Sequence, residues 1–202
     1  MKIFCIGRNY AEHAKELRND LPDEPLVFMK PPTAVLMDDK PFYHPEFSEN
    51  IHHELELVLK VSKNGKHITP EFASSYYEEI GLGIDFTARD VQDKLKTKGH
   101  PWELAKGFDN SAVVGKFISK DSLDVDNIQF TLLKNGTVQQ KGSTQDLIFD
   151  FNTLIVYISK FFTLQKGDLI YTGTPAGVSK VNIGDVLEGS IGETKLLHCE
   201  IK

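Results

Sequence analysis

Three carboxylates in two segments of the sequence have a spacing that suits a metal ion. Glu54 and Glu56 stand two residues apart in an alternating segment, so in a strand both side chains project from one face. Asp85 ends the apolar run 80–84, whose two glycines permit close backbone approach. Three carboxylates with no cysteine beside them favour an all-oxygen site for Mg²⁺ or Mn²⁺, with Ca²⁺ as a further candidate. Without Asp85, the glutamates would indicate the solvated face of an amphipathic strand.

His52 and His53 precede these glutamates and offer a rival interpretation as zinc ligands. Adjacent residues of a strand face opposite ways, so at most one of the two imidazoles could join Glu54 and Glu56. We therefore favour the oxygen site.

A histidine and a glutamate three residues apart could form a general base. His13 and Glu16 fall within a helix predicted over 8–17, where side chains at i and i+3 reach each other. A carboxylate bonded to one imidazole nitrogen fixes the tautomer and raises the basicity of the other nitrogen. A solvated helix face rich in Glu, Lys and His produces the same spacing, so the pair alone does not decide between the two.

Two further segments contain residues that could belong to a site. Lys106 stands in the mostly apolar segment 102–108, and a surface lysine with its stem on apolar neighbours is the alternative there. Segment 172–178 follows a predicted strand and offers two hydroxyls, free N–H groups and two glycines, which suits a carboxylate. It has neither phosphate-loop pattern, GxxxxGK[ST] or GxGxxG, and by itself it predicts a turn.

Strands must position most of these residues. Segment 53–61 alternates, with its leucines on one side and its glutamates on the other, and shorter apolar runs indicate strands at 2–6, 80–84, 130–133, 169–171 and 186–187. Asn64-Gly65 and Asn135-Gly136 predict tight hairpin turns. Helices are predicted over 8–17, 89–96 and 147–161, and the proline-rich segment 21–45 as loop with short extended pieces. The predicted fold class is α+β, dominated by antiparallel or mixed sheet.

Composition excludes several classes of protein. The 202 residues carry 23 Lys and Arg against 29 Asp and Glu, a net charge of −6 that argues against a dedicated nucleic-acid binder. No apolar run approaches the roughly 18 residues that span a bilayer, so we expect a cytoplasmic protein with no membrane partner. Cys5 and Cys199 lie at opposite ends of the chain and predict neither a disulfide framework nor a CxxC metal site.

These segments occur in the order of a known family. The chain resembles the fumarylacetoacetate hydrolase (FAH) superfamily, and more closely its short single-domain acylpyruvase and oxaloacetate decarboxylase type members. The matching landmarks are Gly7-Arg8-Asn9-Tyr10 with His13 and Glu16, Lys30-Pro31-Pro32, His53-Glu54-Leu55-Glu56, Gly83-Ile84-Asp85 with Arg89 and Gln92, Lys106-Gly107-Phe108, and Thr172 to Val178. Each is weak alone, but the ordered set covers nearly the whole chain and is specific.

The resemblance implies a three-layer β/β/α fold with a mixed, mostly antiparallel sheet and few helices, in a single catalytic domain over 1–202 that forms a homodimer. It implies Mg²⁺ or Mn²⁺ bound by Glu54, Glu56 and Asp85, and catalysis by His13, Glu16 and Lys106 with the His-Glu pair on a mobile lid. It also implies substrate binding by Arg8, Tyr10, Arg89, Gln92 and Thr174.

The substrate that the resemblance implies is a small 2-keto acid with a second carbonyl or carboxyl group at the β position. Such a substrate chelates the cation, and cleavage beyond C3 leaves a pyruvate enolate that the metal and Lys106 stabilise. We therefore expect a metal-dependent C–C bond hydrolase of acylpyruvate-like 2,4-diketo acids, in which His13 activates water. Decarboxylation or tautomerisation of oxaloacetate, and isomerisation of 2-hydroxyhepta-2,4-diene-1,7-dioate, stay open as alternatives on the same site.

A non-catalytic, metal-binding β-rich module is the alternative outside the enzymes. It predicts that Lys106, His13 and segment 172–178 are scattered, whereas an enzyme requires that they converge on the three carboxylates. For an enzyme, we expect segments 21–32 and 94–102 to recognise the distal end of the substrate.

Overall fold

The computed structural model describes residues 1–16, 20–37 and 39–202. A seven-stranded sheet in the order β2-β1-β11-β5-β6-β8-β3 runs through it, with β1/β11 and β3/β8 parallel and its other ladders antiparallel. Its strands are β1 (Ile3–Gly7), β2 (Leu26–Lys30), β3 (Val35–Leu36), β5 (Leu55–Val61), β6 (Tyr77–Asp85), β8 (Ala112–Ser119) and β11 (Leu169–Tyr171).

Two smaller antiparallel sheets complete the β structure. The four-stranded sheet, in the order β10-β9-β13-β14, packs on β5, β6 and β8. It is formed by β9 (Gln129–Lys134), β10 (Thr137–Ser143), β13 (Val186–Ile191) and β14 (Thr194–Glu200). The three-stranded sheet, in the order β12-β4-β7, is formed by β4 (Ile51–His53), β7 (Thr87–Ala88) and β12 (Ser179–Lys180).

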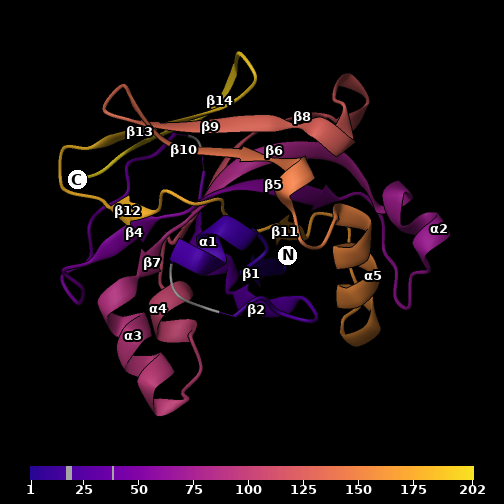
Figure 1. Ribbon diagram of the computed structural model, residues 1–202, viewed down its shortest axis with the longest axis horizontal. Coiled ribbons are helices and arrows are strands. Elements are labelled where there is room, and N and C mark those ends of the chain that lie inside the picture. The colour runs from indigo at the N-terminus through magenta and orange to yellow at the C-terminus, as the bar shows by residue number, and fades with distance from the viewer. Residues whose placement is uncertain (17–19, 38) are drawn as a thin grey trace.

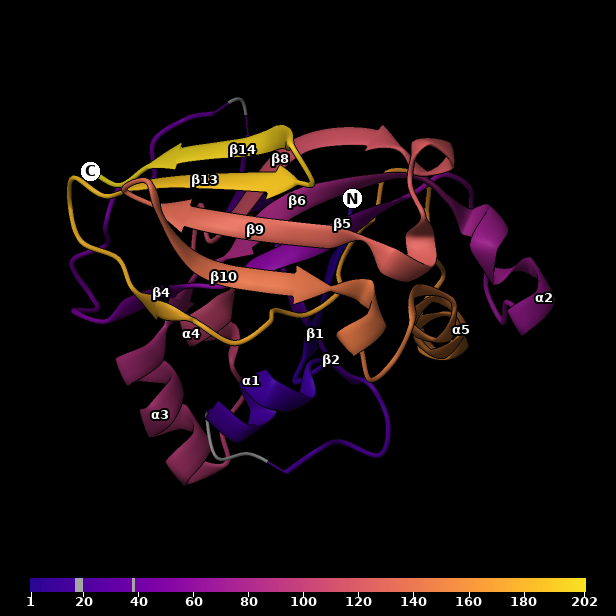
Figure 2. The ribbon, with the colours of Figure 1, turned by 45° about the horizontal axis from the view of Figure 1, so that its top comes forward.

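Helices pack around the sheets in two groups, one beside β1, β2 and β7 and the other at the opposite end of the molecule (Figure 1, Figure 2). They are α1 (Ala11–Glu16), α2 (Pro70–Ala73), α3 (Arg89–Lys98), α4 (Glu103–Lys106) and α5 (Phe151–Phe161), with short 3₁₀ turns at Pro32–Ala34, Ser74–Tyr76, Lys120–Ser122, Val125–Asn127 and Thr144–Asp146. In the part of the chain that is described, no helix has the length and apolar character needed to cross a membrane. The arrangement confirms the predicted α+β class with mixed, mostly antiparallel sheet and few helices.

The core lies between the two large sheets. Leu55, Leu57 and Leu59 of β5 pack in one buried cluster with Phe130 of β9 and Leu187 of β13. This confirms the predicted apolar face of the alternating segment. A second buried cluster, which includes Ile3, Cys5, Val58, Ala112 and Tyr171, covers the other face. Because apolar groups bury both faces of β5, a polar side chain on this strand has to find its partners inside the protein.

The ends of the predicted elements differ from the structure for local reasons. The helix predicted over 8–17 begins only at Ala11, because Arg8 has a φ of 59° and Tyr10 forms a bridge to Leu147. Its predicted end at Leu17 lies outside the described residues. The helix predicted over 147–161 begins at Phe151, where the Asp150 carboxylate accepts the N–H of Thr153 at 2.7 Å and caps the helix. The two four-residue helices, α2 and α4, were not predicted.

One of the two predicted Asn-Gly hairpins is present. Asn135 and Gly136 have φ of 53° and 77° between β9 and β10, as a tight turn requires. The prediction for Asn64-Gly65 was wrong, because the chain from β5 to β6 passes through α2 instead of turning at once. Gly65 there forms a bridge with Leu164, and this long-range pairing determines its place.

Candidate metal centre and active site

The predicted strand over 53–61 breaks at Glu54, and this break creates the site. β4 ends at His53 in one sheet and β5 begins at Leu55 in another. The Asp85 N–H donates to the Glu54 carbonyl oxygen at 2.9 Å, so the C-terminal end of β6 lies beside the start of β5. Glu56 pairs in register with Gly83, two residues before Asp85.

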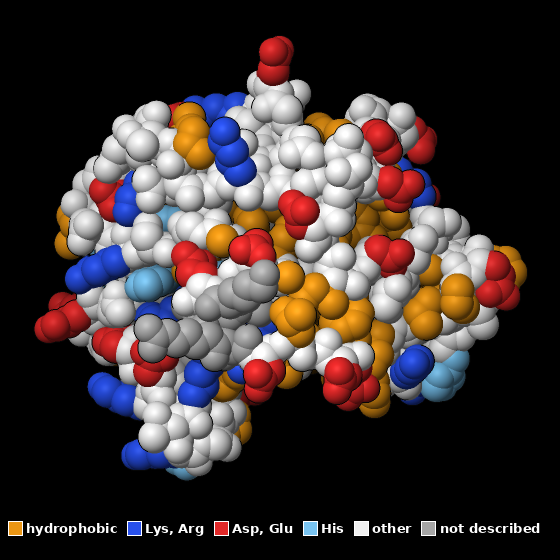
Figure 3. Space-filling model, viewed as in Figure 1, with side chains coloured by type: hydrophobic (Ala, Val, Ile, Leu, Met, Phe, Trp, Pro, Cys, Tyr) orange, Lys and Arg blue, Asp and Glu red, His pale blue; other side chains and the backbone are white. Residues whose placement is uncertain are grey.

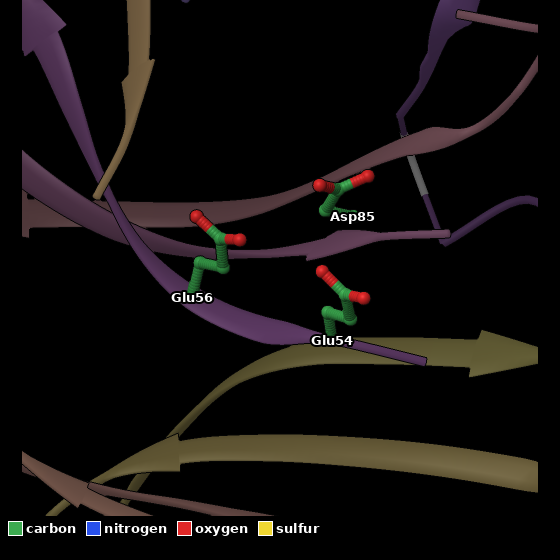
Figure 4. Close-up of side chains that lie close together, drawn as sticks. All are labelled: Glu54, Glu56 and Asp85. Carbon is green, nitrogen blue, oxygen red and sulfur yellow. The ribbon is translucent and has the colours of Figure 1, made fainter. Parts of the chain in front are cut away.

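The three carboxylates come together in the interior. One oxygen from each of Glu54, Glu56 and Asp85 lies within 4.8 Å of the others, and Figure 4 shows the side chains turned toward one another. Their residues are 5%, 2% and 1% exposed, which contradicts the alternative of a solvated strand face. A Cβ at Gly83 would lie 2.6 Å from the Tyr171 ring, so this glycine allows the close approach that the sequence predicted.

Two cations neutralise part of this negative charge. The Lys106 ammonium donates to Glu54 Oε2 at 2.8 Å and to Asp85 Oδ2 at 2.7 Å. Arg89, the first residue of α3, donates to Glu54 Oε1 and, at 2.7 Å, to Gln92 Oε1. Lys106 lies at the end of α4 and is buried, so the alternative of a surface lysine was wrong.

A second lysine, Lys30, contacts the carboxylate cluster through Asp85. In the sequence it was singled out only within the Lys30-Pro31-Pro32 landmark. Its fully buried ammonium lies 2.7 Å from Asp85 Oδ1. It donates to the carbonyl oxygens of Lys106 and Ser111, and to the Ser111 hydroxyl at 3.0 Å. Lys30 therefore ties β2 to the segment that carries Lys106. Its position at the end of the apolar run Leu-Val-Phe-Met was a signal of burial that the sequence contained.

The carboxylates differ in how well their charges are balanced. Burial opposes ionisation of Glu54, but Lys106 and Arg89 outweigh it and hold the pKa of Glu54 well below its usual value. Burial, together with the neighbouring Asp85 and Glu54, raises the pKa of Glu56 well above its usual value. Asp85 and Glu54 overcome the effect of burial on Lys106 and raise its pKa, so this side chain is an ammonium at neutral pH.

The cluster has the chemistry of a divalent-cation site. Its ligands are carboxylate oxygens, which Mg²⁺ and Mn²⁺ prefer. Asp85 Oδ1 is close to Lys30 but accepts no aligned hydrogen bond from any described residue, so it has lone pairs to offer. Oε2 of Glu56 accepts the Gly173 N–H at 2.7 Å, which orients the carboxylate. The residues therefore fit the cation that the sequence predicted.

The rival zinc site is not present among the described residues. His53 bonds through its two ring nitrogens to Gln140 and Ser179, at 3.0 and 2.8 Å. His52 bonds to Asn50 Oδ1 at 3.0 Å. Both imidazoles are thus engaged by neutral side chains instead of joining the carboxylates.

The predicted His-Glu pair is formed on α1. His13 Nδ1 lies 3.2 Å from Glu16 Oε2, and with Nδ1–H as the donor the lone pair is on Nε2. Glu16 also accepts the Gly177 N–H at 3.2 Å, so it links α1 to the 172–178 loop. Burial lowers the pKa of His13 below its usual value, although Glu54 and Glu16 oppose the shift. The imidazole is therefore neutral at pH 7.

One cavity of about 420 Å³, including the solvent at its mouth, joins most of the predicted residues. Its lining contains the carboxylate cluster, His13, Lys106, Arg8, Arg89, Gln92 and Thr174. This convergence is the arrangement that an enzyme requires and that the non-catalytic module did not predict. Phe28, Lys96 and Trp102 line it as well, from the two segments expected at the distal end of the substrate.

Tyr10 is the predicted substrate-binding residue that does not line this cavity. Its buried ring packs edge-on against Phe130, with the ring centres 6.4 Å apart. The expectation is corrected because Tyr10 forms its bridge to Leu147 before α1 begins, which turns the side chain into the core.

A buried amide that the sequence did not single out holds the neutral side of the site. Gln140 Oε1 accepts from the Leu55 N–H and from His53, each at 3.0 Å. Gln140 Nε2 donates to Thr174 Oγ1 at 2.8 Å and to the Pro175 carbonyl oxygen at 2.9 Å. Thr174 in turn donates to the Leu55 carbonyl oxygen. The start of β5 and the 172–178 loop are thereby fixed to each other.

Comparison with known proteins agrees with this geometry. The family described as "Fumarylacetoacetate (FAA) hydrolase C-terminal" matches residues 2–201. The chain belongs to this family.

Individual members of the FAA hydrolase family differ in the reactions that their names state. The chain is 42% identical over 190 residues to the mitochondrial oxaloacetate tautomerase FAHD1 of Bos taurus, covering 94% of this chain and 86% of that protein. It is 43% identical over 192 residues to the mitochondrial oxaloacetate decarboxylase of Dictyostelium discoideum, covering 94% and 88%. The fumarylpyruvate hydrolase of Pseudomonas aeruginosa, solved in complex with Mn²⁺ and pyruvate, superposes with a TM-score of 0.94 at 33% identity, covering 100% of this chain and 89% of that one.

Proposed function

We propose that this protein is a divalent-metal-dependent enzyme that enolises oxaloacetate and so interconverts its keto and enol forms. The observation that carries the proposal is the convergence of a buried carboxylate cluster, an ammonium and a His-Glu pair on one cavity. A relative 42% identical to the chain is named an oxaloacetate tautomerase, which supports this reaction over C–C bond hydrolysis.

Glu54, Glu56 and Asp85 would hold the cation. When bound, a divalent cation polarises the 2-keto oxygen and stabilises negative charge that develops on it. Lys106 donates a hydrogen bond to the same oxygen, because its raised pKa keeps it protonated beside Glu54 and Asp85.

His13 is the base that removes the C3 proton. Its Nε2 carries the lone pair when Nδ1–H donates to Glu16, and burial keeps the imidazole neutral at pH 7. The C3 proton passes to Nε2, the electrons of the C–H bond form the C2–C3 double bond, and the C2 oxygen accepts a proton from Lys106. Solvent then restores the proton of Lys106 and takes up the proton of His13.

Hydrolysis of an acylpyruvate is the second candidate. The His13–Glu16 pair favours it, because the same base can remove a proton from water that attacks the distal carbonyl carbon. The superposed fumarylpyruvate hydrolase supports it as well. Loss of CO₂ from oxaloacetate needs no such water. It leaves a pyruvate enolate, whose oxygen Lys106 stabilises in the same way.

The test compares two substrates on metal-stripped protein, with and without added Mg²⁺. Conversion between the keto and enol forms of oxaloacetate is followed by ultraviolet absorbance, and pyruvate is quantified from oxaloacetate and from acetylpyruvate against blanks that contain Mg²⁺ alone. We expect Mg²⁺-dependent tautomerisation of oxaloacetate, slowed about 100-fold in H13Q. Acetate and pyruvate in equal amounts from acetylpyruvate, without tautomerisation, would replace the proposal by the hydrolase.

A further inference from the structure

The outer part of the cavity contains two cations whose charges the protein does not balance. Lys96 of α3 and Arg8, just before α1, both line the cavity and are half-buried. Among the described residues, neither has a carboxylate within ion-pair distance, whereas Arg89 and Lys106 both pair with Glu54. Partly buried cations without a counter-ion favour an anionic ligand.

Arg8 has a backbone conformation that its side chain makes unfavourable. Its φ of 59° lies in the left-handed region, where a Cβ is crowded. Asn9 holds the chain in place there, because its side chain donates to the carbonyl oxygens of Phe149 and Thr172 at 3.0 and 2.8 Å. Such strain persists where the surrounding structure imposes it, and it clusters at functional sites.

Lys96 lies beside a pair of aromatic rings, Trp102 and Phe28. Its ammonium is 5.6 Å from the centre of the Trp102 ring, and Trp102 meets Phe28 edge-on with the ring centres 5.9 Å apart. Burial, Arg89 and Arg8 lower the pKa of Lys96. Figure 3 shows basic and acidic side chains together over the part of the surface that α3 forms, and α3 carries Lys94 and Lys98 as well as Asp90 and Asp93. Among the residues that line the cavity, Lys96 and Arg8 therefore contribute two positive charges that no lining carboxylate pairs with.

We propose that Lys96 and Arg8 form a distal anion subsite, which binds the second carboxylate of a dicarboxylic 2-keto acid. The inference rests on the proposed function for its orientation: the carboxylate and keto group of the substrate lie at Glu54, Glu56 and Asp85, so the distal group points to the mouth. The subsite makes the enzyme selective for dicarboxylates over monocarboxylates that lack the distal carboxylate.

Two inert acids measure this selectivity without turnover. Malate and lactate share a carboxylate and a 2-hydroxyl group, and only malate has the distal carboxylate. Trp102 is the single tryptophan of the chain and contacts Lys96, so its emission reports on this subsite. Binding of each acid is titrated by Trp102 emission and by calorimetry at one fixed free Mg²⁺ concentration.

We expect malate to bind at least 10-fold more tightly than lactate. In K96Q the affinity for malate falls about 10- to 100-fold, the usual effect of losing a hydrogen bond to a charged group, and the affinity for lactate stays within about 2-fold. K94Q is the matched control, because Lys94 is exposed on the same helix, and it keeps the full difference. K96R, which preserves the charge, keeps most of it and serves if K96Q does not fold.

Turnover separates the subsite from the proposed function. In K96Q we expect the KM for oxaloacetate to rise about 10-fold or more with kcat nearly unchanged, because Lys96 does not touch the reacting atoms. Equal affinities of the unaltered protein for malate and lactate, or an undiminished difference in K96Q, would overturn the subsite even if oxaloacetate is turned over. A difference that disappears in K96Q, without any turnover of oxaloacetate, would uphold the subsite and refute the reaction.

Discussion

Two buried networks meet at Glu54, and they differ in charge. On one side, Lys106, Arg89 and Lys30 form ion pairs with Glu54 and Asp85, whereas Glu56 forms none with any described residue. On the other side, Gln140 uses both atoms of its amide to join His53, Thr174 and two backbone segments without any formal charge. The charged network leaves lone pairs for a cation and a substrate, whereas the neutral network has its hydrogen bonds made within the protein.

The difference shows how the protein separates binding from support. A buried charged cluster is costly and sensitive to loss of one member, and a bound cation changes its balance. A neutral network whose members are satisfied stabilises one geometry and has nothing further to bind. We therefore expect Mg²⁺ to restore the stability of variants in the charged network, and not of variants in the neutral network.

Removal of the Lys106 ammonium should have the largest effect. In K106M we expect kcat/KM to fall at least about 1000-fold, since the developing enolate loses a charged donor. The metal-free protein should lose about 3 kcal/mol of unfolding free energy, because Glu54 and Asp85 lose a shared partner. Kinetics and urea unfolding with and without Mg²⁺ measure both effects.

Added Mg²⁺ should recover a substantial part of the stability that K106M loses. K116M alters an exposed lysine of β8 and should change neither stability nor activity. If Mg²⁺ stabilised K106M no more than K116M, the charged network would not be the cation site.

Loss of the buried amide should be the next largest effect. Q140L leaves the Leu55 N–H and the Pro175 carbonyl oxygen without their partner, and we expect a loss of about 3 kcal/mol in the unfolding free energy. Mg²⁺ should not restore it, because no charge is involved. The control is Lys141→Leu, at an exposed position of the same strand. Recovery of Q140L by Mg²⁺ would remove the distinction between the two networks.

Substitution of His13 shows whether this base contributes to cation binding or only to catalysis. In H13Q we expect kcat to fall about 100-fold, with the affinity for Mn²⁺, measured by electron paramagnetic resonance, unchanged. The acid limb of kcat/KM should lie below pH 6.5, because burial lowers the pKa of His13, and it should be absent from H13Q. The exposed His100 supplies the control H100Q. Weaker Mn²⁺ binding in H13Q would place His13 among the ligands.

The smallest predicted effect is the pH dependence of the neutral network. Burial lowers the pKa of His53 to about 4 in the folded protein, so below the ordinary value of 6.5 the unfolded chain binds the proton first. Stability is therefore retained above pH 6.5 and lost as the pH falls toward 4. Between pH 7 and 5.5 the loss from His53 is about 1 kcal/mol.

The variant H53Q should lack this contribution. Urea unfolding of the metal-free protein at pH 7 and 5.5 gives the difference in stability between H53Q and the unaltered chain. That difference should shrink by about 1 kcal/mol at the lower pH. A constant difference would mean that His53 does not titrate between the folded and unfolded states in this range.

Local patterns in the sequence determined much of this protein. The alternation of β5 predicted which leucines enter the core, Asn135-Gly136 predicted a turn that needs positive φ, and the spacing of Glu54 and Glu56 predicted that both face one way. These features depend on residues close together in the chain, where the period of a strand or the φ of a turn suffices. The ordered landmarks also predicted the family.

The tertiary structure decided the features that depend on contacts between distant segments of the chain. The break at Glu54, the burial of Lys30 and Lys106, and the four bonds of Gln140 depend on segments that are far apart in the chain. The burial of Tyr10 in the core and the bridge between Gly65 and Leu164 also depend on such long-range contacts. Whether a lysine is solvated or buried between carboxylates follows from which strands pack around it, and the local pattern of residues does not contain that information.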